Sequence, residues 1–120
     1  MGCGNIRITD GRILVSLVGG EVWVTKHQIA DLFGCFVAKV DANVRATLKT
    51  GTLEEDKVCR TLRYANGSSV VLYNLEMITA LSFRIRSANA DLFRRWLMAR
   101  AVGGKKISVI VSPSNQMLLN

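Results

Sequence analysis

The sequence predicts an α+β fold in which a two-helix unit lies between two β-hairpins and two further helices follow. Three observations predict it: a capped helix that ends at a glycine before a second amphipathic segment, β-type stretches joined by glycine turns, and two apolar helical stripes after residue 74. Helix, tight turn, helix and then hairpin is the order of a winged helix-turn-helix. We expect one domain over residues 1–120, with its core at about 13–102 and a tail or short strand at 103–120.

The first hairpin is predicted over residues 13–24. Residues 13–18 and 21–24 are rich in β-branched and aromatic side chains, and Gly19-Gly20 lies between them. Two glycines supply the positive φ angles that a tight hairpin turn requires. We therefore expect these two runs to pair with each other.

The two-helix unit begins at Thr25. Thr25 and Gln28 have the spacing of a capping box, in which each side chain accepts a hydrogen bond from the other residue's amide. The first helix is expected over residues 26–33 and ends at Gly34, because helices commonly close on a residue with positive φ. A second helix is expected over residues 37–50, with Val40 and Val44 on its apolar side and Gly51 after it.

The remaining elements are a second hairpin and two helices. An acidic turn at 54–56 precedes expected strands at 58–65 and 70–73, which are joined around Asn66-Gly67. Asn74 is placed to cap a helix that ends near residue 86, and Ser87 to cap the next one, which glycines 103 and 104 interrupt. Residues 107–111 form a short β-like run.

The charge is strongly positive and unevenly distributed. The formal net charge is +7, and residues 61–120 hold eight lysines and arginines against two acidic residues. Such an excess favours a polyanionic partner, most commonly nucleic acid. The alternative is a basic surface that only keeps the protein soluble.

The second helix and the second hairpin supply the candidate DNA contacts. Lysines and arginines lie beside alanines on one side of the helix, and small residues let a helix approach a groove closely. An asparagine can bridge adenine, and hairpin arginines can bind phosphates. The candidate DNA-binding residues are Lys39, Ala42, Asn43, Arg45, Lys49, Arg60 and Arg63.

Two further groups are candidates for backbone or partner contacts. The basic cluster in the last two helices contains Arg84, Arg86, Arg94 and Arg95. Phe83 falls outside the apolar side of its helix, and an aromatic residue there often marks an interface. Phe36, at the apolar start of the second helix, is the other possible interface residue. A homodimer is one such interface.

From Gly20 to about Arg100 the chain resembles the RhuM family of virulence-associated and mobile-element proteins. The motifs that carry the resemblance are Gly-Glu-Val-Trp-Val-Thr at 20–25, Gln-Ile-Ala-Asp-Leu-Phe-Gly at 28–34, Gly-Thr-Leu-Glu-Glu-Asp at 51–56, Val-Cys-Arg at 58–60 and Tyr-Asn-Leu-Glu at 73–76. Phe-Arg-Ile-Arg-Ser at 83–87 and Phe-Arg-Arg-Trp at 93–96 are similar to two further runs of that family. The resemblance implies a small domain of phage, plasmid or island DNA that binds DNA and is related to phage antirepressor-type modules.

These observations predict a non-catalytic, regulatory DNA-binding protein of a bacterial mobile element. The alternative is an interaction module without base readout, because Phe36, Val37 and Ala38 open the second helix with apolar side chains. Cys3, Cys35 and Cys59 lack the spacing of a zinc site, and the sequence contains no phosphate-binding glycine loop or carboxylate pair. We expect no cofactor, no membrane segment and no secretory leader, hence a cytoplasmic protein.

Overall fold

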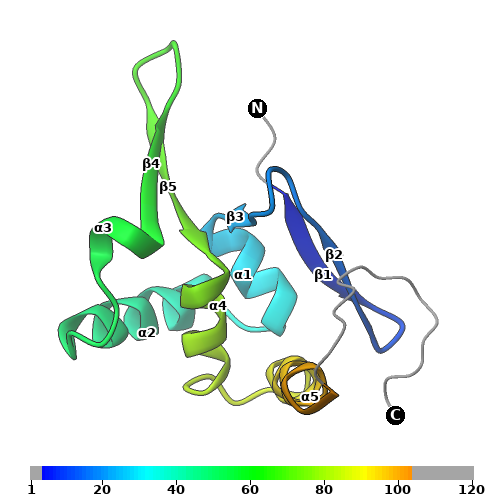
Figure 1. Ribbon diagram of the computed structural model, residues 1–120. Coiled ribbons are helices and arrows are strands. Elements are labelled where there is room, and N and C mark those ends of the chain that lie inside the picture. Colours follow the sequence, from blue (N-terminus) through cyan, green and yellow to red (C-terminus); the bar gives the residue numbers. More distant parts are fainter. Residues whose placement is uncertain (1–3, 104–120) are drawn as a thin grey trace.

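The computed structural model describes residues 4–103, which form five helices and two antiparallel sheets in an α+β arrangement (Figure 1). Their order is β1 (Asn5–Thr9), β2 (Arg12–Ser16), β3 (Trp23–Val24), α1 (Lys26–Phe33), α2 (Val37–Lys49), α3 (Glu55–Val58), β4 (Cys59–Arg63), β5 (Ser69–Asn74), α4 (Leu75–Ser82) and α5 (Ala88–Gly103). The expected β-like run at 107–111 lies outside the described residues. Within 4–103, no helix combines the length and the hydropathy that a bilayer crossing needs.

The two sheets lie on opposite sides of α1. Strands β1 and β2 form one sheet, and the other has the order β3-β5-β4. The β4–β5 hairpin projects away from the body of the molecule, while α3 and α2 lie at its base (Figure 1). The short strand β3 joins this hairpin to the start of α1, because Trp23 pairs with Asn74 and Val24 with Tyr73.

The predicted pairing of residues 13–18 with 21–24 is wrong. Strand β2 pairs instead with β1, in a register that matches Thr9 with Arg12. The turn between them is Asp10-Gly11, with φ angles of 52° and 75°, and such a turn fits the natural twist of a hairpin. Gly19 and Gly20 do form a tight turn with positive φ, but only one bridge, between Val18 and Glu21, flanks it before the chain departs toward β5.

The second predicted hairpin is confirmed, but its strands cover Cys59–Arg63 and Ser69–Asn74 rather than 58–65 and 70–73. Val58 belongs to α3, into which the expected acidic turn folds, so β4 begins at Cys59. The connecting loop is longer than a two-residue turn: the Tyr64 amide donates to the Ser68 carbonyl, and the Gly67 amide to the Tyr64 carbonyl. Gly67 has a φ of 94°, as expected for a type I turn followed by a glycine bulge.

The predictions for the first two helices are confirmed. The Thr25 hydroxyl accepts from the Gln28 amide at 3.1 Å, and the Gln28 side chain accepts from the Thr25 amide at 2.8 Å. Gly34 ends α1 in the left-handed conformation. The second helix begins at Val37, as expected, but its N-cap residue Phe36 makes no capping hydrogen bond within the described chain.

The third and fourth long helices differ in their limits from the prediction. Asn74 caps α4, since its side chain accepts from the Met77 amide. However, α4 ends at Ser82 rather than near residue 86, because the Phe83 and Arg84 amides bond to carbonyls three residues earlier and tighten the last turn. Ser87 caps α5 as predicted, and that helix includes Gly103 rather than stopping before it.

One continuous core joins all these elements. The Phe33 ring on α1 meets Phe93 on α5 edge to face, with ring centroids 5.8 Å apart, and both side chains are fully buried. Met77 and Ile78 of α4 are fully buried in the same core. This core holds α1, α4 and α5 together and leaves one side of α2 open.

We expect Phe36→Ser to raise the free energy of unfolding by about 1 kcal/mol, because serine supplies the missing N-cap of α2. The exposed phenylalanine ring contributes little packing that serine would remove. Equilibrium unfolding in urea measures the change. Thr25→Ala is the matched control: it removes an existing cap and should lower stability by a similar amount. A loss of stability in Phe36→Ser would contradict this account of the α2 start.

Candidate nucleic-acid interface

The side of α2 that carries lysines, arginine and alanines faces outward. Val40 and Val44 are buried against the core. Lys39, Arg45 and Lys49 are exposed, as is Ala42 on the same side. The 3.6-residue period therefore separates an apolar anchor from an open, basic surface, as the sequence predicted.

Asp41 neutralises part of that surface. One of its carboxylate oxygens lies 2.6 Å from Lys26 Nζ at the start of α1, and the other pairs with Arg45. The Arg45 guanidinium therefore already has an anionic partner, which weakens its attraction to a phosphate. Lys39 and Lys49 have no ion-pair partner within residues 4–103, so the unneutralised charge of α2 lies with these two lysines.

Asn43 is engaged in contacts within the protein. Its Nδ2 donates to the Lys39 carbonyl at 2.9 Å, and its Oδ1 accepts from Arg84 Nε at 3.4 Å. A bidentate contact with adenine would have to release both bonds. The predicted reading role of Asn43 is therefore disfavoured, and the residue instead joins α2 to the turn after α4.

The turn between α4 and α5 consequently lies beside α2. It presents Phe83, Arg84 and Arg86 as exposed side chains. The sequence predicts a separate cluster for these arginines, because no local pattern indicates that Arg84 contacts Asn43. The tertiary structure instead makes Arg84 an extension of the α2 surface, with Arg86 exposed on the same turn.

Two other arginines of the predicted cluster have structural partners. Arg94 is half-buried and donates to the Ser82 carbonyl and to Asp91, which ties α5 to the end of α4. Arg95 pairs with the other oxygen of Asp91 at 3.1 Å. Neither guanidinium is as free to meet a polyanion as the sequence alone indicates.

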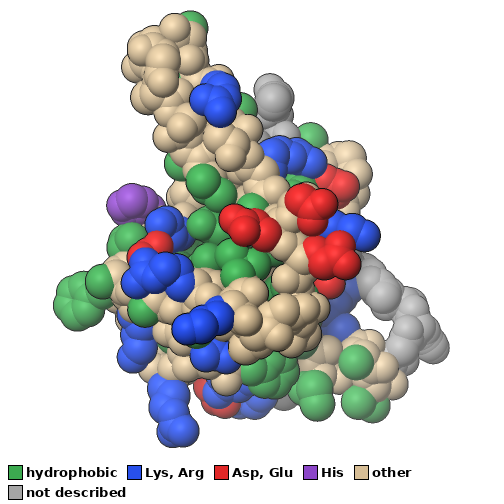
Figure 2. Space-filling view, turned by 90° about the vertical axis from the view of Figure 1, so that its left-hand side faces the viewer, with side chains coloured by type: hydrophobic (Ala, Val, Ile, Leu, Met, Phe, Trp, Pro, Cys, Tyr) green, Lys and Arg blue, Asp and Glu red, His purple; other side chains and the backbone are tan. Residues whose placement is uncertain are grey.

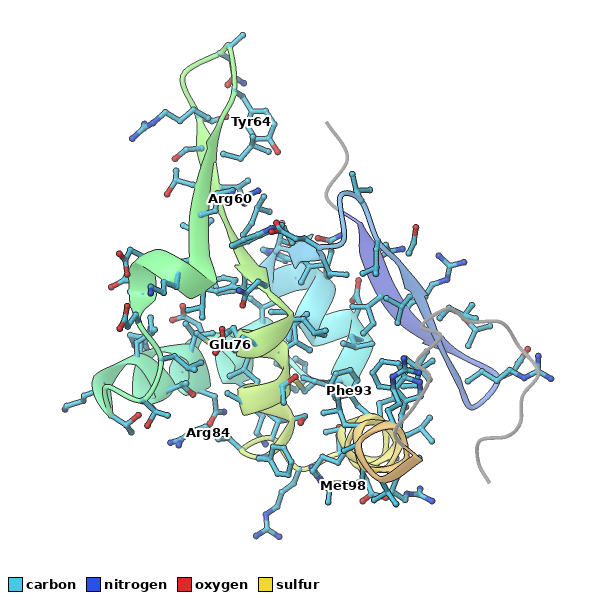
Figure 3. The ribbon with its side chains drawn as sticks, viewed as in Figure 1. Arg60, Tyr64, Glu76, Arg84, Phe93 and Met98 are labelled. Atoms are coloured by element: carbon cyan, nitrogen blue, oxygen red, sulfur yellow. The ribbon has the colours of Figure 1, made fainter. Side chains whose placement is uncertain are left out.

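The two hairpin arginines differ from each other. Arg60 stacks on Trp23, with its guanidinium carbon 3.9 Å from the ring centroid, and lies 3.6 Å from the Glu21 carboxylate (Figure 3). The Trp23 Nε1 donates to the same carboxylate at 2.7 Å. Arg63, nearer the tip, is exposed and has no ion-pair partner among the described residues. Arg60 therefore fixes the base of the hairpin, while Arg63 extends freely.

Acidic side chains interrupt the basic surface at the base of the hairpin. Glu54, Glu55 and Asp56 precede or begin α3, and all three are exposed. Figure 2 shows red side chains grouped to the right of the centre of this face and blue ones mostly along its left and lower parts. A polyanion therefore meets a favourable surface along α2 and the α4–α5 turn, and an unfavourable one at α3.

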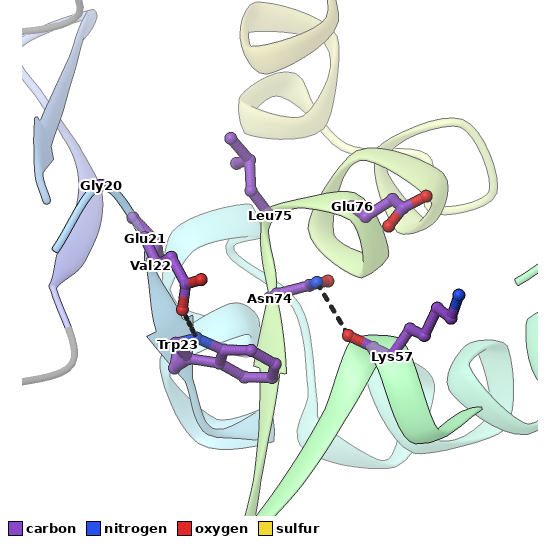
Figure 4. Close-up of a pocket in the computed structure, with 8 residues that line it drawn as sticks. All are labelled: Gly20, Glu21, Val22, Trp23, Lys57, Asn74, Leu75 and Glu76. Carbon is purple, nitrogen blue, oxygen red and sulfur yellow. Dashed lines mark hydrogen bonds between the residues drawn. The ribbon is translucent and has the colours of Figure 1, made fainter. Parts of the chain in front are cut away.

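A cavity of about 220 Å³ lies between β3 and the start of α4 (Figure 4). Its polar groups serve the fold: Glu21 accepts from Trp23, and Asn74 Nδ2 donates to the Lys57 carbonyl at 3.2 Å. The lining residues are Gly20, Glu21, Val22, Trp23, Lys57, Asn74, Leu75 and Glu76.

The described cysteines are poor nucleophiles. Cys35 and Cys59 are half-buried, and burial raises the pKa of both thiols above its ordinary value, so less thiolate is present at neutral pH. Within residues 4–103, no group of three His, Cys, Asp or Glu side chains is placed to hold a metal ion.

Comparison with protein-family models, with curated proteins and with solved structures finds no match to this chain. The resemblance to the RhuM family therefore stays a prediction.

Replacing Arg60 with alanine should lower the free energy of unfolding by about 1 kcal/mol, because it removes the stacking on Trp23 that holds the hairpin base. Urea unfolding measures this change. Arg63→Ala is the matched control on the same strand and should leave stability nearly unchanged. Equal stability losses in the two variants would contradict the different roles assigned to these arginines.

Proposed function

We propose that this chain is a non-catalytic protein that binds double-stranded DNA, with α2 in the major groove and the β4–β5 hairpin on the neighbouring backbone. The observation that carries the proposal is the open side of α2, where Lys39 and Lys49 lack an ion-pair partner within residues 4–103 and small alanines stand between them. A surface with unpaired cations and little bulk can enter a groove lined by phosphates.

The arrangement of the neighbouring elements supports this proposal. Helix α1, the short turn at residues 34–36, α2 and then the hairpin have the order of a winged helix-turn-helix, and the pairing of β3 with β5 closes the sheet beside α1. The hairpin rises from the same side of the molecule as α2 (Figure 1). Its exposed Arg63 is then placed to contact a backbone phosphate.

The α4–α5 turn adds a second flank to the proposed interface. Arg84 lies against α2 through Asn43, and Arg86 is exposed on the same turn. Phosphate contacts of this kind fix the position of a protein on DNA and add affinity without reading sequence. The exposed acids of α3 orient the duplex further, because they repel phosphates and favour a path along α2 and this turn.

A regulatory role on a bacterial mobile element follows from the resemblance to the RhuM family. That resemblance includes Val58-Cys-Arg60, and here Arg60 stacks on Trp23 at the hairpin base. The shared residues are thus ones that hold the proposed wing in place. This part of the proposal rests on the sequence motifs alone.

The test is the salt dependence of duplex binding. Lys39→Ala with Lys49→Ala should flatten the slope of log K against log[salt] by about two units, because each phosphate contact contributes about 0.9. Fluorescence anisotropy with a labelled random-sequence duplex measures it. Arg95→Ala is the control, since its guanidinium pairs with Asp91 and should affect the slope little.

Two results would contradict the proposal. One is the absence of duplex binding by the unaltered protein at low salt. The other is a double variant whose salt slope equals that of the unaltered protein, because α2 would then not face the phosphates.

The exposed Phe83 favours a second candidate function, association with another copy of the chain. Phe83 is 61% exposed on the α4–α5 turn, and Met98 of α5 is 59% exposed. DNA-binding proteins of this kind often bind as dimers on two half-sites.

If Phe83 contributes to such a dimer, Phe83→Ser should weaken self-association by about tenfold or more, because an apolar anchor leaves the interface. Sedimentation velocity over a concentration series measures it, with Val102→Ser as a control at another exposed apolar residue. A monomer at every concentration would rule out this second candidate.

A further inference from the structure

We propose that Phe36 is a specificity-determining residue that recognises thymine by packing against its 5-methyl group in the major groove. This inference rests on the proposed function, because it requires α2 to lie in the groove of a duplex. It adds a base preference that the basic side chains do not provide.

Phe36 breaks two local rules at one position. It is 85% exposed, the highest fraction among the large hydrophobic residues that are exposed in the described chain. It also occupies the N-cap of α2 and makes no capping hydrogen bond there. Natural sequences keep such conflicts mainly where a residue serves function rather than folding. The position therefore calls for a partner outside the protein.

The surroundings of Phe36 fit DNA better than a protein. A phenylalanine side chain supplies about 150–250 Å², while a stable protein interface buries about 800 Å² on each partner. Beyond Phe36, the exposed side chains at the start of α2 are Ala38 and Lys39, which add no large apolar area. A single phenylalanine ring beside an unpaired lysine instead suits DNA, where the ring can contact a small apolar group on a base and the lysine a nearby phosphate.

The chemistry of the ring selects the base. Phenylalanine neither donates nor accepts a conventional hydrogen bond, so it has nothing to offer the amino and carbonyl groups of the base edges. The faces of paired bases are stacked within the duplex, which leaves only their edges accessible. Among those edges in the major groove, thymine alone presents a methyl group.

Removal of that methyl group from the DNA tests the inference. Selection from a random-sequence duplex pool yields a preferred site, which is then synthesised with thymine and with uracil, since uracil lacks only the 5-methyl group. The unaltered protein should bind the uracil duplex about fourfold more weakly for each contacted methyl, the value of one buried methyl group. Phe36→Ser should bind both duplexes equally, although its α2 cap is improved.

Val102→Ser is the matched control, because it removes the second most exposed large apolar side chain of the described residues from α5, outside α2 and the α4–α5 turn. It should keep the same ratio of thymine to uracil affinity as the unaltered protein. A ratio near one in the unaltered protein, with duplex binding intact, overturns the role of Phe36 and leaves the proposed function standing. Failure to bind either duplex overturns both. A Phe36→Ser variant that keeps the ratio but changes the sedimentation coefficient assigns the ring to a protein interface and overturns the inference as well.

Discussion

The pairing of β3 with β5 is the contact on which the arrangement of this molecule depends. It comprises only two residue pairs, yet it joins segments about fifty residues apart and places the base of the hairpin at the start of α1. Trp23 belongs to this pairing; Arg60 stacks on its ring, and its indole Nε1 donates a hydrogen bond to the Glu21 carboxylate. Together with the buried side chains of Val58, Leu72 and Tyr73, this contact fixes the direction of the β4–β5 hairpin relative to the helices.

Electrostatic pairing within the protein divides the cations into two kinds. Arg45, Arg94 and Arg95 have carboxylate partners, and Arg100 stacks on Trp96, so each of these side chains already has a partner within the protein. The cations that remain without an acidic partner in the described chain lie along α2, on the α4–α5 turn and near the tip of the β4–β5 hairpin, and two more, Arg7 and Arg12, lie on the β1–β2 hairpin. The net charge of +7 therefore does not show where a polyanion would be attracted, because some of the cations are already paired within the protein and others are not.

The start of α2 illustrates a conflict between stability and recognition. A serine or aspartate there would cap the helix and would satisfy an amide that Phe36 leaves to solvent. Phenylalanine at this position lacks that cap and also exposes a large apolar ring to water, and both effects lower the stability of the folded protein. Such an arrangement persists only because the core around Phe33 and Phe93 supplies enough stability elsewhere.

The sequence by itself determined the local structure wherever a short-range interaction controls it. The capping box at Thr25, the left-handed Gly34, the Asn74 and Ser87 caps and the second hairpin all depend on neighbours within a few residues, so their patterns are readable in the chain. The pairing of β2 could not be predicted from turn residues, because Asp10-Gly11 and Gly19-Gly20 both form tight turns, and β2 pairs with the strand before it rather than with the segment after it.

The candidate site shows the same division more sharply. The outward side of α2 followed from its 3.6-residue period, whereas the approach of Arg84 to Asn43, the pairing of Asp41 with Lys26 and the stacking of Arg60 on Trp23 did not. These contacts join residues that are distant in sequence, and each depends on how two elements pack. Only the tertiary structure determines these contacts, because the sequence specifies the charge of each side chain, whereas the fold determines which residue lies beside it.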